Sequence, residues 1–116
     1  MDKLWIVILG VVVLVLVVKA MAGASRGNTV VAKEKIKQGA LAMDVRSAGE
    51  YQRGHFDGAL NIPVQELETR IDELKDKKRA IVVYCASGMR SANAAKILSS
   101  AGFTDVTDAG GWDNLK

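Results

Sequence analysis

The sequence AIVVYCASGMRSANAAKILSSAG (Ala80 to Gly102) decides the fold class of this chain. Its first six residues are apolar and rich in β-branched side chains, with no alternation of polar positions, which predicts a central strand of a parallel sheet. From Ser91 the sequence is rich in alanine and stops at a glycine, which predicts a helix. The chain therefore places Cys85, its only cysteine, where a strand gives way to a helix.

Short strands and helices alternate on either side of this segment. We predict strands at 40–45, 58–63 and 103–111, and helices at 30–39, 47–54 and 64–75. Ser47 and Glu50 have the spacing of a capping box at the start of the second of these helices. This alternation predicts one parallel sheet covered by helices on both faces. Ligands of such folds bind at the carboxyl ends of the strands, which is where Cys85 lies.

An apolar run, LWIVILGVVVLVLVV (Leu4 to Val18), precedes the alternating segments. A helix from Leu4 to Ala24 would measure about 31 Å, enough for a hydrocarbon core of about 30 Å. We therefore expect residues 1–27 to form a transmembrane anchor with a short tether, and residues 28–116 to form the folded domain. A signal peptide cleaved among the small residues at 20–24 is the alternative.

The basic residues flank the apolar run unequally. Lys3 precedes it, whereas Lys19, Arg26 and three further lysines follow it before residue 38. The positive-inside rule then predicts a single-pass protein of the inner membrane with its domain in the cytoplasm. An unpaired thiol fits that reducing compartment. Cleavage of a signal peptide would instead leave the domain in the periplasm.

Composition excludes several classes of function. From Asn28 onward, 13 basic residues face 12 acidic ones, with no basic stripe interleaved with aromatics, so we expect no binding of nucleic acid. One cysteine and one histidine exclude the usual zinc sites and an intramolecular disulfide. Cys85 is therefore either a buried small apolar residue or a reactive thiol.

The loop after Cys85 favours the reactive thiol. Its residues are Ala86, Ser87, Gly88, Met89 and Arg90. Small residues let the backbone curl so that successive N–H groups point inward as an anion nest, and the positive end of the following helix adds to the field. We therefore predict a lowered pKa for Cys85. Arg90 adds planar donors suited to an incoming oxyanion.

Two reactions use a thiolate that faces an oxyanion cradle. Cysteine phosphatases attack phosphorus, but that chemistry usually needs a longer loop and an acid for the leaving oxygen, and residues 85–89 include no acid. Alternatively, the thiolate takes the outer sulfur of thiosulfate as a persulfide and releases sulfite, which needs little help from a proton. The shorter loop favours sulfur transfer, with a phosphatase or arsenate reductase as a rival.

Three segments resemble a single-domain rhodanese, a thiosulfate sulfurtransferase-like module. They are DVRSAGEYQRGHFDGALNIP (Asp44 to Pro63), VVYCASGMRS (Val82 to Ser91) and DAGGW (Asp108 to Trp112). The resemblance implies an α/β fold with a five-stranded parallel sheet and helices on both faces. It also implies a persulfide on Cys85, with the amides of residues 86–90 holding that persulfide or the donor anion, and no metal or organic cofactor.

We therefore predict a membrane-anchored sulfurtransferase. It would take sulfane sulfur from a small anionic donor such as thiosulfate and pass it to a thiol, to cyanide or to a protein. The alternative is a non-catalytic or sulfur-carrier module that localises a partner at the membrane. Among the other polar residues, we expect His55 to be structural and Asp44 to pair with Arg46. We expect Trp112 to cover the core.

Overall fold

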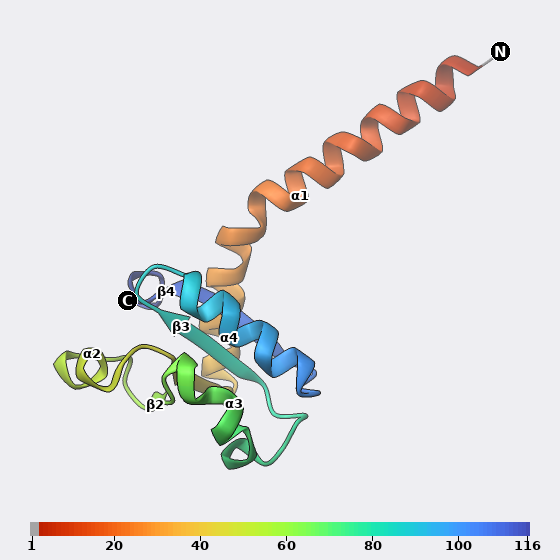
Figure 1. The fold of residues 1–116 in the computed structure, drawn as a ribbon. Helices are drawn as coiled ribbons and strands as arrows, with labels where there is room; N and C mark the ends of the chain where they lie inside the picture. Colours follow the sequence, from red (N-terminus) through yellow and green to blue (C-terminus); the bar gives the residue numbers. More distant parts are fainter. Residues whose placement is uncertain (1–2) are drawn as a thin grey trace.

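Four parallel strands form one sheet in the computed structural model, which describes residues 3–116, with side chains at 3–12 and 29–116. The strands are β1 (Leu41–Asp44), β2 (Leu60–Asn61), β3 (Ile81–Cys85) and β4 (Val106–Gly111), in the order β2-β1-β3-β4 (Figure 1). Because β3 lies between β1 and β4, the prediction that this apolar strand is central is confirmed.

The helices connect these strands and flank the sheet. They are α1 (Lys3–Lys37), α2 (Ala48–Arg53), α3 (Leu67–Arg70) and α4 (Met89–Ser100), with short 3-10 helices η1 (Val64–Glu66), η2 (Ile71–Leu74) and η3 (Trp112–Leu115). The capping box at the start of α2 is confirmed: the Glu50 N–H donates to Ser47 Oγ at 3.2 Å, and the Ser47 N–H donates to Glu50 Oε1 at 3.3 Å.

Side chains of β3 alternate between two cores, because successive residues of a strand point to opposite faces. Ile81, Val83 and Cys85 pack beneath α3 and α4. Val82 and Tyr84 pack on the opposite face, with the end of α1 and with η3. Helices therefore cover both faces of the sheet, as predicted.

The expected fifth strand is absent from residues 3–116, so the prediction of a five-stranded sheet is wrong. The residues before β1 belong to α1, whose last turns bury Ala32 against the same core as Ala109 of β4 and Leu115 of η3. The stretch from β2 to β3 holds η1, α3 and η2. Each described segment outside the four strands therefore forms a helix or a short connection.

The N-terminal segment also differs from expectation. Among the residues whose side chains the structure describes, 3–12 and 29–116, no helix combines the length and the apolar character needed to cross a membrane, so the prediction of a transmembrane helix is not supported. Residues 13–24 of that predicted helix lie outside the described side chains. The tether expected before residue 28 is helical instead, since α1 continues without a break to Lys37. A helix that passes directly into the domain forms a projecting arm (Figure 1).

Candidate active site

A sharp turn joins β3 to α4 at the carboxyl edge of the sheet. Cys85 ends β3, and α4 begins at Met89, two residues earlier than the expected start near Ser91. Gly88 turns the chain with φ 106, a left-handed conformation that costs glycine little. The loop is therefore only three residues long, and Met89 and Arg90 lie in the first turn of the helix.

Hydrogen bonds surround the sulfur of Cys85. The Gly88 N–H donates to Sγ at 3.0 Å and the Ser91 N–H donates at 3.3 Å, while Ser91 Oγ lies 3.5 Å from Sγ. Burial acts to raise the pKa of Cys85, but the hydrogen bond between its sulfur and the Ser91 side chain and the bonds from the N–H groups of Ser91, Gly88 and Ser87 lower it overall. The shift has the direction that the sequence predicts.

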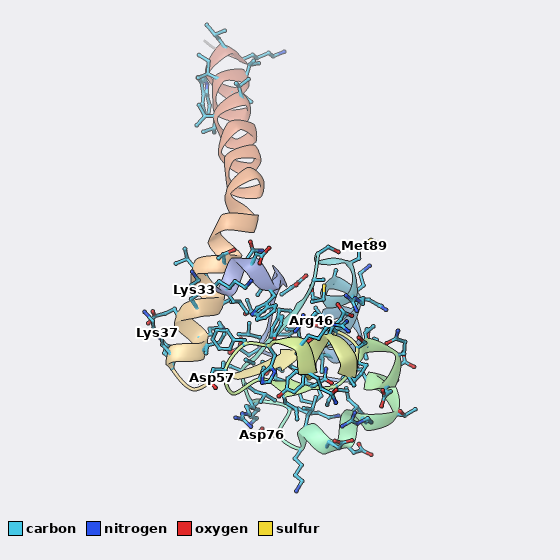
Figure 2. The ribbon with its side chains drawn as sticks, turned by 90° about the vertical axis from the view of Figure 1, so that its left-hand side faces the viewer. Lys33, Lys37, Arg46, Asp57, Asp76 and Met89 are labelled. Atoms are coloured by element: carbon cyan, nitrogen blue, oxygen red, sulfur yellow. The ribbon has the colours of Figure 1, made fainter. Side chains whose placement is uncertain are left out.

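The loop that surrounds the sulfur leaves Cys85 buried. Cys85 has an exposed fraction of 0%, whereas Met89 above it is 83% exposed and lies at the surface of the domain (Figure 2). Ala86 and Ser87 are also exposed. Solvent therefore reaches Sγ only if the residues around it move.

Arg90 does not contact the sulfur, because Glu50 of α2 holds its guanidinium. Arg90 Nη1 lies 2.7 Å from Glu50 Oε1, and Arg90 Nη2 lies 3.1 Å from Glu50 Oε2. These hydrogen bonds are the main reason that the pKa of Glu50 is lowered to about 2. The pair links α2 to the first turn of α4.

Two residues of this site did not emerge from the sequence. In the sequence, Ser91 is only the predicted first residue of a helix, although in the structure its side chain is buried against Cys85. The sequence predicts Glu50 only as a capping residue. Because 40 residues separate it from Arg90, no local pattern predicts their contact. The one available hint is Arg90 itself, since a cation near a helix N-terminus needs a compensating anion.

A buried network supports the neighbouring strand end. Arg46 and Asp44 form the expected pair, with Nη2 2.6 Å from Oδ2, and the Tyr84 hydroxyl donates to the same carboxylate oxygen at 2.8 Å. Burial raises the pKa of Tyr84, so its hydroxyl keeps its proton and remains a donor. The Trp112 ring covers the guanidinium of Arg46, 4.7 Å from ring centre to Cζ. Trp112 therefore covers this pair as well as the core.

His55 lies at the surface and makes local contacts. Its ring stacks on Tyr51 at 3.7 Å between ring centres, and its Nδ1 lies 2.8 Å from the Tyr51 carbonyl oxygen. Both contacts are with the preceding turn of the chain, so the interpretation of His55 as a structural residue fits its surroundings.

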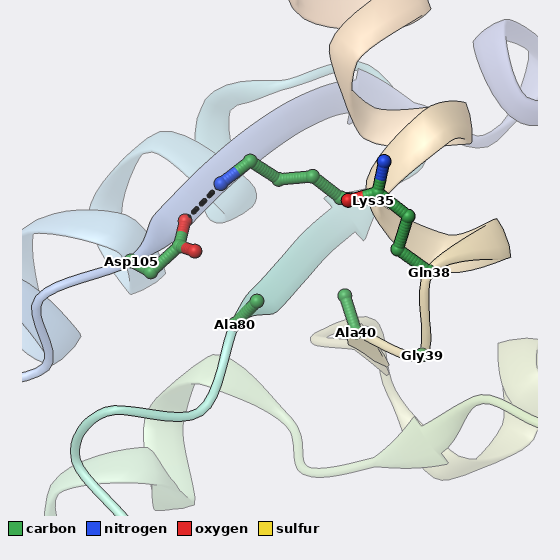
Figure 3. A pocket seen from close by; sticks show the side chains of 6 residues that line it. All are labelled: Lys35, Gln38, Gly39, Ala40, Ala80 and Asp105. Atoms are coloured by element: carbon green, nitrogen blue, oxygen red, sulfur yellow. Dashed lines mark hydrogen bonds and ion pairs between the residues drawn. The ribbon is translucent and has the colours of Figure 1, made fainter.

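A separate cavity of about 240 Å³ opens at the opposite edge of the sheet (Figure 3). Ala40, Ala80 and Asp105, which line it, directly precede β1, β3 and β4. Its charged groups, Lys35 and Asp105, pair with each other. In the described residues, no group of three or more metal-ligating side chains gathers here or elsewhere. The chemistry of the chain therefore points to the Cys85 loop and not to this cavity.

Comparison with known proteins agrees with this geometry. Residues 29–116 match the Rhodanese-like domain family. Thiosulfate sulfurtransferase PspE of Escherichia coli (strain K12) is 44% identical over 74 residues, which cover 63% of this chain and 71% of PspE. Other relatives are matched over a smaller share of their own length. One is matched over 52% of its length and 58% of this chain, and another over 14% of its length and 62% of this chain.

Solved structures give the same result. A rhodanese with anions from E. coli superimposes with a TM-score of 0.61 at 41% identity, over 65% of this chain and 89% of that one. A human single-domain sulfurtransferase, TSTD1, superimposes with a TM-score of 0.60 at 30% identity, over 68% and 82%. These relatives support a sulfurtransferase-like enzyme and confirm the α/β fold. The chain belongs to the rhodanese-like domain family.

Proposed function

We propose that this chain is a sulfurtransferase that carries sulfane sulfur as a persulfide on Cys85. One observation carries the proposal: N–H groups of Gly88 and Ser91 lie 3.0 and 3.3 Å from Sγ, so the loop stabilises negative charge on this sulfur. The same N–H groups can bind the charge of a second sulfur attached to the first. The names of PspE and TSTD1 support the same reaction class.

The first half of the reaction loads the sulfur. The Cys85 thiolate attacks the outer sulfur of thiosulfate, an S–S bond forms to Sγ, and the bond between the two sulfurs of thiosulfate breaks with its electron pair leaving on sulfite. Charge is conserved, since a monoanion and a dianion give a persulfide anion and a dianion. No proton moves, so no general acid or base is required.

The second half returns the enzyme to its starting state. An acceptor thiolate or cyanide attacks the outer sulfur of the persulfide, and Cys85 leaves as the thiolate that the loop already stabilises. Because Cys85 is fully buried, both halves require the loop at residues 86–89 to move aside. The loop therefore controls entry of the donor and of the acceptor.

The intact mass of the full chain after incubation with thiosulfate tests the proposal. We expect a gain of one sulfur atom, its loss on addition of cyanide, and formation of thiocyanate in repeated turnovers. Cys85→Ala is expected to show neither the mass gain nor turnover. Equal rates of thiocyanate formation in the two proteins would overturn the proposal.

A sulfur-carrier module is the second candidate, and the complete burial of Cys85 favours it. A carrier would accept one sulfur and keep it until a partner protein opens the loop. It would therefore gain the mass of one sulfur but show no turnover with cyanide alone. Turnover in the same assay would exclude this second candidate.

A further inference from the structure

Glu50 of α2 pairs with Arg90, the only cation in the first turn of α4. We propose that Glu50 determines the donor preference of this site by competing with anionic donors for the Arg90 guanidinium. The inference rests on the proposed function and names the class of donor: monoanionic donors of sulfane sulfur are favoured over dianionic ones such as thiosulfate.

The contacts of Glu50 fix it in this position. Both of its carboxylate oxygens accept hydrogen bonds from Arg90, at 2.7 and 3.1 Å. Its Oε1 also accepts a bond from the Ser47 hydroxyl at 3.0 Å. A carboxylate held from both sides is already placed where an anionic donor would bind the guanidinium. A donor must therefore displace Glu50 or leave Arg90 paired.

The charges around the sulfur give the direction of the preference. The pKa of Arg90 is raised mainly by its bonds to Glu50, and the charge of Cys85 adds to the effect, so Arg90 lies within electrostatic reach of the sulfur. Because Glu50 neutralises Arg90, the negative charge of the Cys85 thiolate is not balanced by a side chain of this pair. The site as a whole is therefore negatively charged. Repulsion grows with the charge of the donor, so a dianion is disfavoured more than a monoanion.

Two donors with the same reactive outer sulfur separate the effect of charge from that of chemistry. Thiosulfate is a dianion, and benzenethiosulfonate is a monoanion. In Glu50→Gln we expect the KM for thiosulfate to fall about two- to fivefold, the size of effect that one partly exposed charge produces. The KM for benzenethiosulfonate should fall less, so the ratio of the two KM values decreases.

Glu73→Gln is the matched control. Glu73 also pairs with an arginine, Arg70, and its removal changes the net charge equally, but it lies on η2 away from the Cys85 loop. We expect its two KM values to match those of the wild type. A rise in the thiosulfate KM of Glu50→Gln, or an unchanged ratio, would show that Glu50 only braces Arg90 and would overturn the inference.

A salt titration of the wild-type chain tests the same inference without a variant. Screening weakens repulsion of a dianion more than that of a monoanion. Raising the ionic strength should therefore lower the ratio of the thiosulfate KM to the benzenethiosulfonate KM, whereas a rising ratio would contradict the inference. If Cys85 transfers sulfur from neither donor, the proposed function itself fails. Transfer with an unchanged ratio would refute only the role of Glu50.

Discussion

The hydroxyl of Ser91 is placed to respond to ionisation of Cys85. It has one proton, which it donates to the Gly88 carbonyl oxygen at 3.1 Å while the thiol donates to Ser91 Oγ. When the thiol ionises, the hydroxyl can turn its proton toward the sulfur. A hydrogen bond to a charged group is stronger than one to a neutral group, so Ser91 stabilises the thiolate selectively.

We expect Ser91→Ala to raise the pKa of Cys85 and to slow its alkylation by iodoacetamide at pH 7 about three- to tenfold, because one of its donors is lost. The rates as a function of pH give the measurement. Ser99→Ala, at an exposed position of the same helix, is the control and should leave the profile unchanged. An alkylation profile of Ser91→Ala identical to that of the wild type would contradict this role.

The lowered pKa of Cys85 predicts the pH dependence of the proposed sulfur loading. The thiol is inactive below its pKa and the thiolate is active above it, so the rate should rise with pH and then level off. We expect the plateau to begin at a lower pH than for a peptide thiol, whose pKa is about 8.5. Mass measurement of the loaded chain after short incubations with thiosulfate gives the profile. A plateau at or above the peptide value would contradict it.

The end of β4 supports the loop after Cys85 through a close approach of two backbones. A Cβ added at Gly111 would lie 2.8 Å from the Ala86 carbonyl oxygen, nearer than real Cβ contacts allow. We expect Gly111→Ala to displace the loop and to lower the rate of sulfur transfer about tenfold to hundredfold, since shifts of about 1 Å have such effects. Thiocyanate formation provides the measurement.

Gly49→Ala is the matched control for this substitution. A Cβ there would lie 3.9 Å from Arg53, an ordinary contact, within the helix that also carries Glu50. Its activity should match that of the wild type. Equal loss in both variants would show that the activity tolerates no added methyl group near the site, and would refute a specific role for Gly111.

The link between α2 and α4 depends on pH. The pKa of Glu50 is lowered from an ordinary 4.5 to about 2, chiefly by Arg90. Its stabilising effect is therefore complete above pH 4.5 and is lost as the pH falls toward 2. Between pH 6 and pH 3 we expect the urea midpoint to fall more in the wild type than in Glu50→Gln. Parallel curves would show that the pair adds nothing to stability.

Local patterns in the sequence predicted most elements but not their long-range contacts. The uninterrupted apolar run at 80–85 gave β3 within one residue, and Ser47 with Glu50 gave the start of α2. The predicted helix at 64–75 is split into η1, α3 and η2. The contact between Glu50 and Arg90 depends on how α2 packs on α4, and no local sequence pattern predicts that packing. The fifth strand came from a family resemblance and not from a pattern in the residues.

The last turns of α1 belong to the folded domain and not to a separate appendage. Ala32 is fully buried, with the β3 side chains Val82 and Tyr84 among the members of its core cluster. We expect Ala32→Leu to lower the free energy of unfolding by about 1–3 kcal/mol, the usual cost of overpacking. Val30→Leu, at a position 69% exposed, is the control and should change little. Urea titration measures both, and equal stabilities would contradict the packing of α1 on the sheet.

The short connection from α1 to β1 fixes the direction in which the arm projects. Only residues 38–40 separate these elements, so the chain reverses and α1 runs opposite to the strands. Its beginning therefore extends beyond the edge of the sheet where the strands end, and in Figure 2 the arm rises on the side on which Met89 lies. A partner that bound the exposed apolar turns at residues 4–12 would therefore lie on the same side of the domain as the loop that follows Cys85.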